Sequence, residues 1–393
     1  MSARHILHLV LLPVAVCLVM LSSLAGQNQA GPSDAVAISS PTSDRLHQPG
    51  WWPTKTDAPR GDYAGTAACV KCHRSIAESY QSMAMSHASE VAATADVLLK
   101  NPALHFQSGP YNYTLATTRD KSTYTVSDGK QTVSHELVWA LGAGSLGQTY
   151  VYQQGDKFYE SHVSYYSGIE GLDFTTGHAR GVPQNLEAAA GRRIYTPETS
   201  LCFRCHTTAS FDVNKFEPAG LENGVTCEAC HGPAASHVAG ERAGMAEAAG
   251  AVLNPTNFDR GDAVDFCGAC HRTTGDVIEN GWDDIGVINA RFQPYRLQKS
   301  RCWASGDTRL ACTTCHDPHK PLVHEAAAYD AACLRCHVAM GAKASADHPG
   351  NGCNVSQDNC VTCHMPEYEL PGAHSKFSDH YIRVVKSGEP YPN

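Results

Sequence analysis

One five-residue pattern occurs seven times in this 393-residue sequence: two cysteines separated by two residues, with a histidine directly after the second. Such a C-x-x-C-H segment is the attachment motif of haem c. The two thiols form thioethers with the haem vinyl groups, and the histidine binds the iron from one side of the ring. We therefore predict covalently attached haems c, seven in number.

The residues of these motifs, numbered 1 to 7 along the chain, use 14 of the 17 cysteines. The predicted thioether cysteines are Cys69, Cys72, Cys202, Cys205, Cys227, Cys230, Cys267, Cys270, Cys312, Cys315, Cys333, Cys336, Cys360 and Cys363. The predicted proximal iron ligands are His73, His206, His231, His271, His316, His337 and His364. Zinc ribbons also use cysteine pairs, but the constant place of the histidine disfavours them.

Seven large apolar cofactors would replace much of an ordinary side-chain core. The low aromatic content of 8% and the 33 glycines fit a chain wrapped tightly around them. Successive motifs after residue 202 lie 21 to 45 residues apart, which leaves room for one or two short helices each. We expect a mainly α fold with much irregular chain around stacked haems. Residues 61–104 would form a first haem segment and residues 176–393 a six-haem C-terminal core.

The interval of 133 residues between the histidines of motifs 1 and 2 has a different pattern. Apolar and polar residues alternate around Tyr111 and Tyr124, and Asp128-Gly129 is a hairpin turn signal. We predict a small antiparallel β-meander, inserted as residues 105–175, that contributes no iron ligand. Its histidines, which are expected at the surface or in internal hydrogen bonds, are His105, His135 and His162, with His135 the least certain.

The first residues resemble an export signal. A modest basic start, an apolar run and Ser23-Leu24-Ala25 predict a cleaved signal peptide over residues 1–25, with a cut after Ala30 as the alternative. An uncleaved anchor is a further alternative, although the apolar run is short for a membrane span. Residues 26–60, rich in Ser, Pro, Gln and Gly, read as a flexible linker. The expected location is periplasmic or extracellular.

The net charge of the sequence indicates which kinds of binding partner to expect. The formal net charge is −9, and each ferric haem with two ionised propionates would add about −1. The sequence has no polybasic tract interleaved with aromatic residues, which disfavours nucleic acid. We expect redox proteins as electron donor and acceptor, other cytochromes among them, and membrane contact only if the N-terminal segment is uncleaved.

Seven six-coordinate irons would need seven further ligands. Several histidines follow a motif closely, and a loop can carry such a side chain to a neighbouring ring. Methionine is poorly placed in the C-terminal half, so bis-histidine ligation and low reduction potentials are expected. The predicted distal ligands are His87, His178, His237, His319, His348, His374 and His380. The weakest are His87 and His178, with His135 and His324 as substitutes.

Two cysteines after the signal lie outside the motifs, Cys302 and Cys353. In an oxidising compartment an even pair left over suggests a disulfide. Two separate thiols are the alternative.

Several short sequence segments resemble those of the multihaem c-type cytochromes of the tetrahaem cytochrome c and hydroxylamine oxidoreductase superfamily. They are C-E-A-C-H-G-P-A-A-S-H at 227–237, C-T-T-C-H-D-P-H at 312–319, C-V-T-C-H-M-P at 360–366 and H-S-K-F-S-D-H at 374–380. The resemblance implies closely packed bis-histidine haems outside the cytoplasm. By position it also implies that His237, His319, His348, His374 and His380 are distal ligands.

Three functions fit these features. The first is an electron carrier in which closely packed haems pass electrons between partners. The second is an oxidoreductase that acts on a small nitrogen or sulfur compound at one open iron. The absence of any C-x-x-C-K motif disfavours the subclass that marks its open haem by lysine. The third is a haem-bearing structural or filament subunit.

Overall fold

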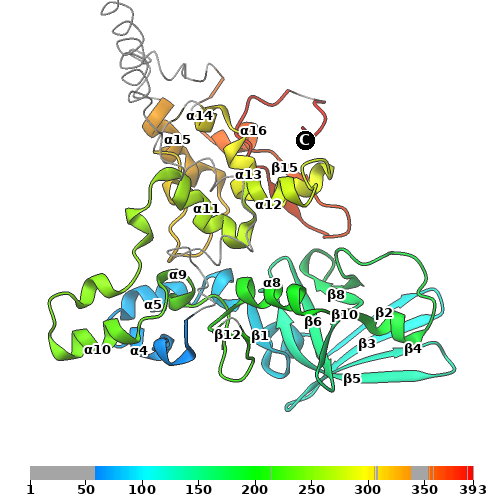
Figure 1. The fold of residues 1–393 in the computed structure, drawn as a ribbon. Helices are drawn as coiled ribbons and strands as arrows, with labels where there is room; N and C mark the ends of the chain where they lie inside the picture. Colours follow the sequence, from blue (N-terminus) through cyan, green and yellow to red (C-terminus); the bar gives the residue numbers. More distant parts are fainter. Residues whose placement is uncertain are drawn as a thin grey trace, which may run out of the picture. The chain divides into compact units, whose positions relative to one another are not determined.

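The structure is a computed structural model that describes residues 58–393, except 214, 305, 307, 308, 338–352, 354, 357, 387 and 393 (Figure 1). The described residues belong to one unit, Ser40–Asn393. The predicted signal peptide, the predicted linker up to residue 57 and His348 lie outside the described residues. Among the helices that are described, none combines the length and the hydropathy that a membrane span requires.

The largest element is a ten-stranded sheet in which all paired strands are antiparallel. The strands are β1 (Ser89–Val91), β2 (Ala103–Ser108), β3 (Tyr111–Thr117), β4 (Ser122–Ser127), β5 (Thr132–Leu141), β6 (Gly147–Gln154), β7 (Lys157–Ser161), β8 (Val163–Tyr166), β9 (Gly171–Phe174) and β10 (Gly191–Ile194). The main order is β10-β7-β6-β5-β4-β3-β2. Strand β1 pairs with β5, and β8 pairs with β6 and β9.

This sheet shows that the prediction of a mainly α fold is wrong. The predicted meander is the central part of this sheet, but strands that precede and follow the meander in the sequence also join the sheet. Strand β1 pairs Ser89 with Leu141, and β10 pairs Gly191 with Ser161. A Cβ at position 191 would collide with the carbonyl oxygen of Glu160, so the close approach of β10 to β7 requires glycine there. The protein is a mixed α and β fold with a large sheet.

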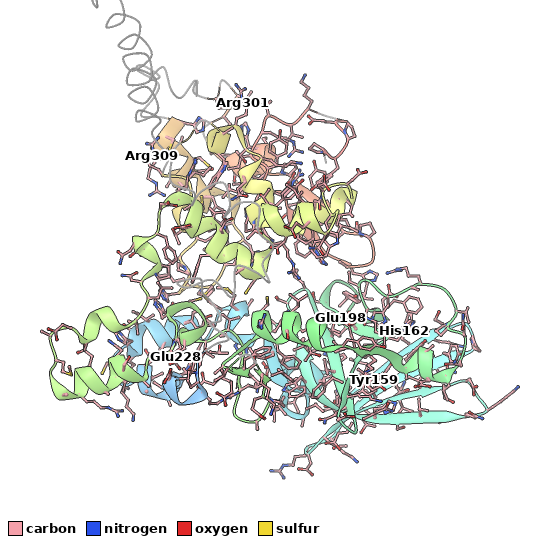
Figure 2. All side chains as sticks on the ribbon, viewed as in Figure 1. Tyr159, His162, Glu198, Glu228, Arg301 and Arg309 are labelled. Atoms are coloured by element: carbon pink, nitrogen blue, oxygen red, sulfur yellow. The ribbon has the colours of Figure 1, made fainter. Side chains whose placement is uncertain are left out.

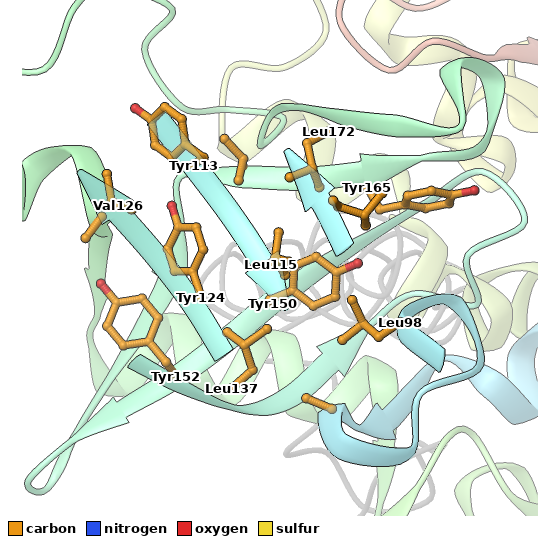
Figure 3. Close-up of a cluster of buried hydrophobic side chains, with 14 of the residues drawn as sticks. Leu98, Tyr113, Leu115, Tyr124, Val126, Leu137, Tyr150, Tyr152, Tyr165 and Leu172 are labelled. Atoms are coloured by element: carbon orange, nitrogen blue, oxygen red, sulfur yellow. The ribbon is translucent and has the colours of Figure 1, made fainter. Parts of the chain in front are cut away.

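The sheet buries side chains on both faces because its strands alternate. One face carries a core rich in tyrosine, which includes Tyr113, Tyr124 and Tyr150 (Figure 3). The other face carries Trp139 and Val151, and Phe203 of helix α8 (Thr196–His206) packs against Trp139 with ring centroids 4.9 Å apart. Burial of a side chain like Phe203 contributes about 2–3 kcal/mol. Because Phe203 lies inside motif 2, this contact fixes that motif on the sheet.

The rest of the described chain consists of short helices, turns and three two-stranded ribbons. The other α-helices are α4 (Thr66–Cys69), α5 (Arg74–Tyr80), α6 (Asp96–Lys100), α7 (Leu186–Ala190), α9 (Cys227–His231), α10 (Ala235–Ala243), α11 (Arg260–His271), α12 (Thr274–Glu279), α13 (Gln293–Gln298), α14 (Arg301–Ala304), α15 (Asp330–His337) and α16 (Cys360–His364). The 3₁₀ helices are η1 (Arg60–Asp62), η2 (Ala84–His87), η3 (Ala92–Thr94), η4 (Ser167–Ile169), η5 (Ala248–Ala251), η6 (Pro255–Asn257), η7 (Gly286–Arg291), η8 (Cys312–Thr314) and η9 (Ala326–Tyr329).

The ribbons pair β11 (Thr207–Thr208) with β14 (Glu222–Asn223), β12 (Phe211–Asp212) with β13 (Lys215–Phe216), and β15 (Glu367–Glu369) with β16 (Lys376–Ser378). Helices this short are marginal by themselves, so most of their stability must come from what packs on them.

Candidate haem centres

The motifs lie at the ends of short helices. Helices α8, α9, α11, α15 and α16 each end at the histidine of their motif. Helix α4 ends at Cys69, the first residue of motif 1, and η8 covers the start of motif 5. One helical turn brings the two thiols of a motif to one side, and the histidine follows at the helix end. This is the local geometry that thioether attachment and proximal ligation need.

Buried carboxylates join the motifs to one another. Glu228, inside motif 3, accepts hydrogen bonds from the backbone N–H groups of Ala64 and Gly65, both at 2.8 Å, just before motif 1 (Figure 2). Asp330, which begins the helix of motif 6, accepts hydrogen bonds from the N–H groups of Asn359 and Cys360 and so caps the helix of motif 7. Hydrogen bonds to charged groups contribute about 1.5–3 kcal/mol each.

Thiols of different motifs meet. The thiols of Cys69 and Cys227 lie close enough to interact, and this interaction lowers the pKa of Cys227. Thiols of three further pairs of motifs interact in the same way. These pairs are Cys205 with Cys270, Cys267 with Cys312, and Cys333 with Cys360. Motif 1 therefore adjoins motif 3, motif 2 adjoins motif 4, motif 4 adjoins motif 5, and motif 6 adjoins motif 7.

Two weaker electrostatic interactions between thiols link these groups. Burial raises the pKa of Cys230 to about 12, and the neighbouring Cys267 of motif 4 adds to the shift. Burial also raises the pKa of Cys315, to which Cys333 of motif 6 contributes. The spatial order of the motifs is thus 1-3-4-5-6-7, with motif 2 beside motif 4.

Three motif histidines face a second histidine. The ring centroids lie 6.5 Å apart for His73 and His237, and 6.0 Å apart for His231 and His319. A third pair, His316 and His380, has centroids 6.2 Å apart. Two imidazoles on opposite sides of one metal should have centroids about 6–6.5 Å apart, because each metal–nitrogen bond is about 2 Å long. The spacing fits one iron between the rings of each pair.

Hydrogen bonds set which ring nitrogen can bind a metal. The Nδ1 atoms of His231, His237 and His380 lie 2.8, 2.8 and 3.0 Å from the backbone oxygens of Leu253, Ala248 and Ser378. The Nδ1 atoms of two other motif histidines, His206 and His364, contact the carbonyl oxygens of Ala88 and Arg383 in the same way, both at 2.8 Å. Since a carbonyl only accepts, Nδ1 must carry the proton and Nε2 keeps its lone pair for a metal.

Burial favours the neutral form of three of the candidate ligands, and the neutral form is the one that binds a metal. It lowers the pKa of His380 to about 4, and it also lowers the pKa values of His206 and His316. The chain therefore supplies the three kinds of group that hold haem c: thiols, proximal histidines and distal histidines.

A buried ionic network holds His380 in place. The neighbouring Asp379 accepts two hydrogen bonds from Arg296, at 2.8 and 2.9 Å, and both side chains are 0% exposed. Asp379 also accepts a hydrogen bond from Arg383 at 2.8 Å. The Ser300 hydroxyl donates to the carbonyl oxygen of His380. The sequence analysis did not identify this network, although the Asp379-His380 pair within the H-S-K-F-S-D-H phrase could have indicated it.

A cavity of about 550 Å³ adjoins motif 3. Its lining includes Cys227 and Tyr80. The ring of Tyr80 lies 6.5 Å from that of His319, and its hydroxyl donates to the carbonyl oxygen of Val225. This volume is in the range of cofactor pockets. The cavity therefore fits part of a haem attached at Cys227.

The other predicted distal ligands have different contacts. His87 lines the cavity, but its Nε2 bonds the Gln81 carbonyl oxygen at 2.9 Å. His178 lies in the sheet region, where Nδ1 contacts His162 at 3.1 Å and Nε2 contacts Glu160 at 2.8 Å.

The Nε2 atom of His374 contacts Asp173 at 2.7 Å. The described contacts give these three residues no support as iron ligands, so their roles stay predictions. His348 lies outside the described residues.

The histidines of the predicted meander bond to neighbours within the sheet. His105 contacts the Thr114 hydroxyl, and His135 contacts the Gln154 amide and stacks on Tyr152.

The predicted disulfide between Cys302 and Cys353 is not formed, although the structure describes both residues. Cys302 lies near Cys315 of motif 5, where it contributes to the raised pKa of that thiol. The sulfur of Cys353 accepts a hydrogen bond from the backbone N–H of Val355, and its residue is exposed. The parity of the cysteine count was a weak signal because the two residues have separate local environments.

Comparison with known proteins supports a multihaem cytochrome. Residues 175–232, which contain motifs 2 and 3, match the family model "Cytochrome c554 and c-prime". The multihaem cytochrome MtrA of Shewanella baltica (strain OS185) is 23% identical over 210 residues, which are 47% of this chain and 60% of that protein. The crystal structure of the outer cell wall cytochrome OcwA is 15% identical and has a TM-score of 0.48, over 82% of this chain and 80% of that chain.

The chain is therefore similar to multihaem c-type cytochromes, as its motifs predicted. This likeness agrees with covalently bound haem c. The finer resemblance to the tetrahaem cytochrome c and hydroxylamine oxidoreductase superfamily stays a prediction.

Proposed function

We propose that this chain is an exported electron-transfer cytochrome that holds six haems c in one series and a seventh beside it, and that it passes electrons between redox partners. The observation that carries the proposal is the spatial order of the motifs, in which every motif has thiols close enough to interact with those of another motif. Haems attached to thiols that lie close together would have the edges of their rings close together.

Haem iron supplies the one-electron chemistry, and the protein supplies ligation, spacing and exclusion of water. His237, His319 and His380 would complete the ligand shells opposite His73, His231 and His316. An iron held between two fixed histidines has no position left for a substrate. Arg296 and Asp379 would orient one such ligand through a network that water does not reach. These features favour a carrier over a catalyst.

The expected partners are redox proteins, and the expected location is periplasmic or extracellular. Support comes from the signal-like start of the sequence and from two similar proteins, one named a multihaem cytochrome and the other an outer cell wall cytochrome. The net charge of −9 before haems are counted would favour positively charged docking surfaces on partners.

Reductive titration of the holoprotein, followed by carbon monoxide, tests this function. We expect seven electron equivalents per chain and no stoichiometric spectral change with carbon monoxide, because a six-coordinate iron has no free position. Stoichiometric carbon monoxide binding at one haem would instead favour the oxidoreductase that acts on a small nitrogen or sulfur compound.

A further inference from the structure

Three arginines gather where motif 2 meets motif 4. Arg204 lies inside motif 2, Arg272 directly follows motif 4, and Arg291 ends helix η7. The thiols of Cys205 and Cys270 are in contact here, and the charges of Arg204 and Arg272 both act on Cys205. Arg291 is close enough to Arg272 for their like charges to interact. The cluster is therefore a concentration of positive charge beside two predicted haem sites.

Aromatic rings hold these guanidinium groups. Arg272 lies over Trp282 at 5.5 Å from the ring centroid, and Arg291 lies over Phe292 at 5.3 Å. Trp282 and Phe292 stack on each other with centroids 5.7 Å apart. The two arginines thus flank one aromatic pair. On the motif 2 side, Arg204 lies over Phe211 at 4.6 Å. Cation–π contacts fix the positions of the groups but leave their charge unneutralised.

Carboxylate partners are missing for all three arginines. Within the described part of the chain, none of them forms an ion pair or a hydrogen bond to another side chain. Arg204 is only 7% exposed, and its Nε is buried with no partner. Burial lowers the pKa of Arg204, whereas Arg272 is half-buried and Arg291 is exposed. A buried charge without a partner is unfavourable, so an anion beside Arg204 would compensate its charge.

The carboxylate of Asp276 lies near Cys205 and caps a helix. Asp276 acts on Cys205, and its Oδ2 accepts hydrogen bonds from the backbone N–H and the hydroxyl of Thr273 at 2.8 and 2.7 Å. These bonds form the capping box of α12.

The backbone conformation at Arg272 is unusual for a residue that has a side chain. Its φ is +73°, a region that favours glycine. The residue that directly follows motif 3 has the same φ of +73°, and it is a glycine, Gly232. This conformation is strained for an arginine. Glycine at position 272 would remove that strain, and it would also remove the charge.

We propose that Arg204, Arg272 and Arg291 form an anion-binding site between motifs 2 and 4 that takes a carboxylate or an inorganic oxyanion. Guanidinium groups match the planar, two-oxygen geometry of carboxylates and bind them in a bidentate manner. A haem propionate at motif 2 or 4 is one source of such a group. A free oxyanion from solution is the other.

Spectroelectrochemical titration of the holoprotein tests the site, with and without added sulfate. Arg272→Gly and Arg291→Gln should each lower the midpoint potential of at least one haem, because loss of positive charge disfavours the reduced iron. The matched control is Arg119→Gln, at an exposed arginine in the loop between β3 and β4, and it should change no potential. Arg272→Gly should unfold at the same or a higher denaturant concentration than the wild type.

The response to sulfate distinguishes the two sources. A saturable shift in the wild type that both variants lose assigns the site to a free oxyanion. Variant shifts without any sulfate response assign it to a propionate. The proposal is refuted if both variants match Arg119→Gln in potentials and in sulfate response. Intact mass of each variant separates this result from failed haem attachment, which would contradict the proposed function instead.

Discussion

Asp379→Asn should be one of the most damaging single substitutions in the chain. Asp379 is 0% exposed and bonds two arginines, Arg296 and Arg383, at 2.8–2.9 Å. The substitution keeps the shape of the side chain but removes its charge, so two guanidinium groups lose their counter-charge in a buried place. Removal of one partner from a buried ion pair costs about 3–5 kcal/mol. We expect a loss of this size in the free energy of unfolding.

The assay is denaturant unfolding of the holoprotein, followed by far-ultraviolet circular dichroism and by the haem spectrum. The matched control is Asp96→Asn, which breaks the exposed pair of Asp96 and Lys100 and should cost at most about 0.5 kcal/mol. Because Asp379 precedes His380, the variant should also disturb one low-spin centre. A loss of stability no larger than that of the control would refute the account of this network.

Three further predictions concern ligands and packing. His380→Ala and His237→Ala should each convert one low-spin ferric signal to high spin in electron paramagnetic resonance spectra, whereas His105→Ala should leave the spectrum unchanged. Glu228→Gln should lower the free energy of unfolding by about 1–3 kcal/mol, because two partly buried backbone donors and the buried N–H of Ala234 lose a charged acceptor. Burial lowers the pKa of His162 from 6.5 to about 4, so the unfolded chain binds the proton at a higher pH than the folded protein does. The free energy of unfolding should therefore fall as the pH drops from 6.5 towards 4. His162→Gln should remove that part of the pH dependence.

The motifs and their local helices were predictable because each depends on residues close together in sequence. The distal partners were harder to assign. His374 and His380 give the same signal after motif 7, yet His380 faces His316 while His374 bonds Asp173, 201 residues away. Only tertiary contacts distinguish these two histidines, and such contacts cannot be read from the spacing of residues in the sequence.

The size of the sheet could not be predicted from the sequence for a similar reason. The alternating residues around Tyr113 and Tyr124 lie in strands β3 and β4, but β1 and β10 have only three and four residues. Such short strands carry no periodic pattern, and they form because β5 and β7 offer them partners. The spatial order of the motifs, with motif 2 beside motif 4, likewise depends on contacts between distant segments.

Intact mass spectrometry of the mature protein tests the central claim most directly. Attachment of one haem at each of the seven C-x-x-C-H motifs predicts a mass about 4.3 kDa above that of the mature polypeptide, since thioether attachment retains the whole haem. The increment should survive denaturation because the bonds are covalent. Any other number of haems, or their loss on unfolding, would contradict the account.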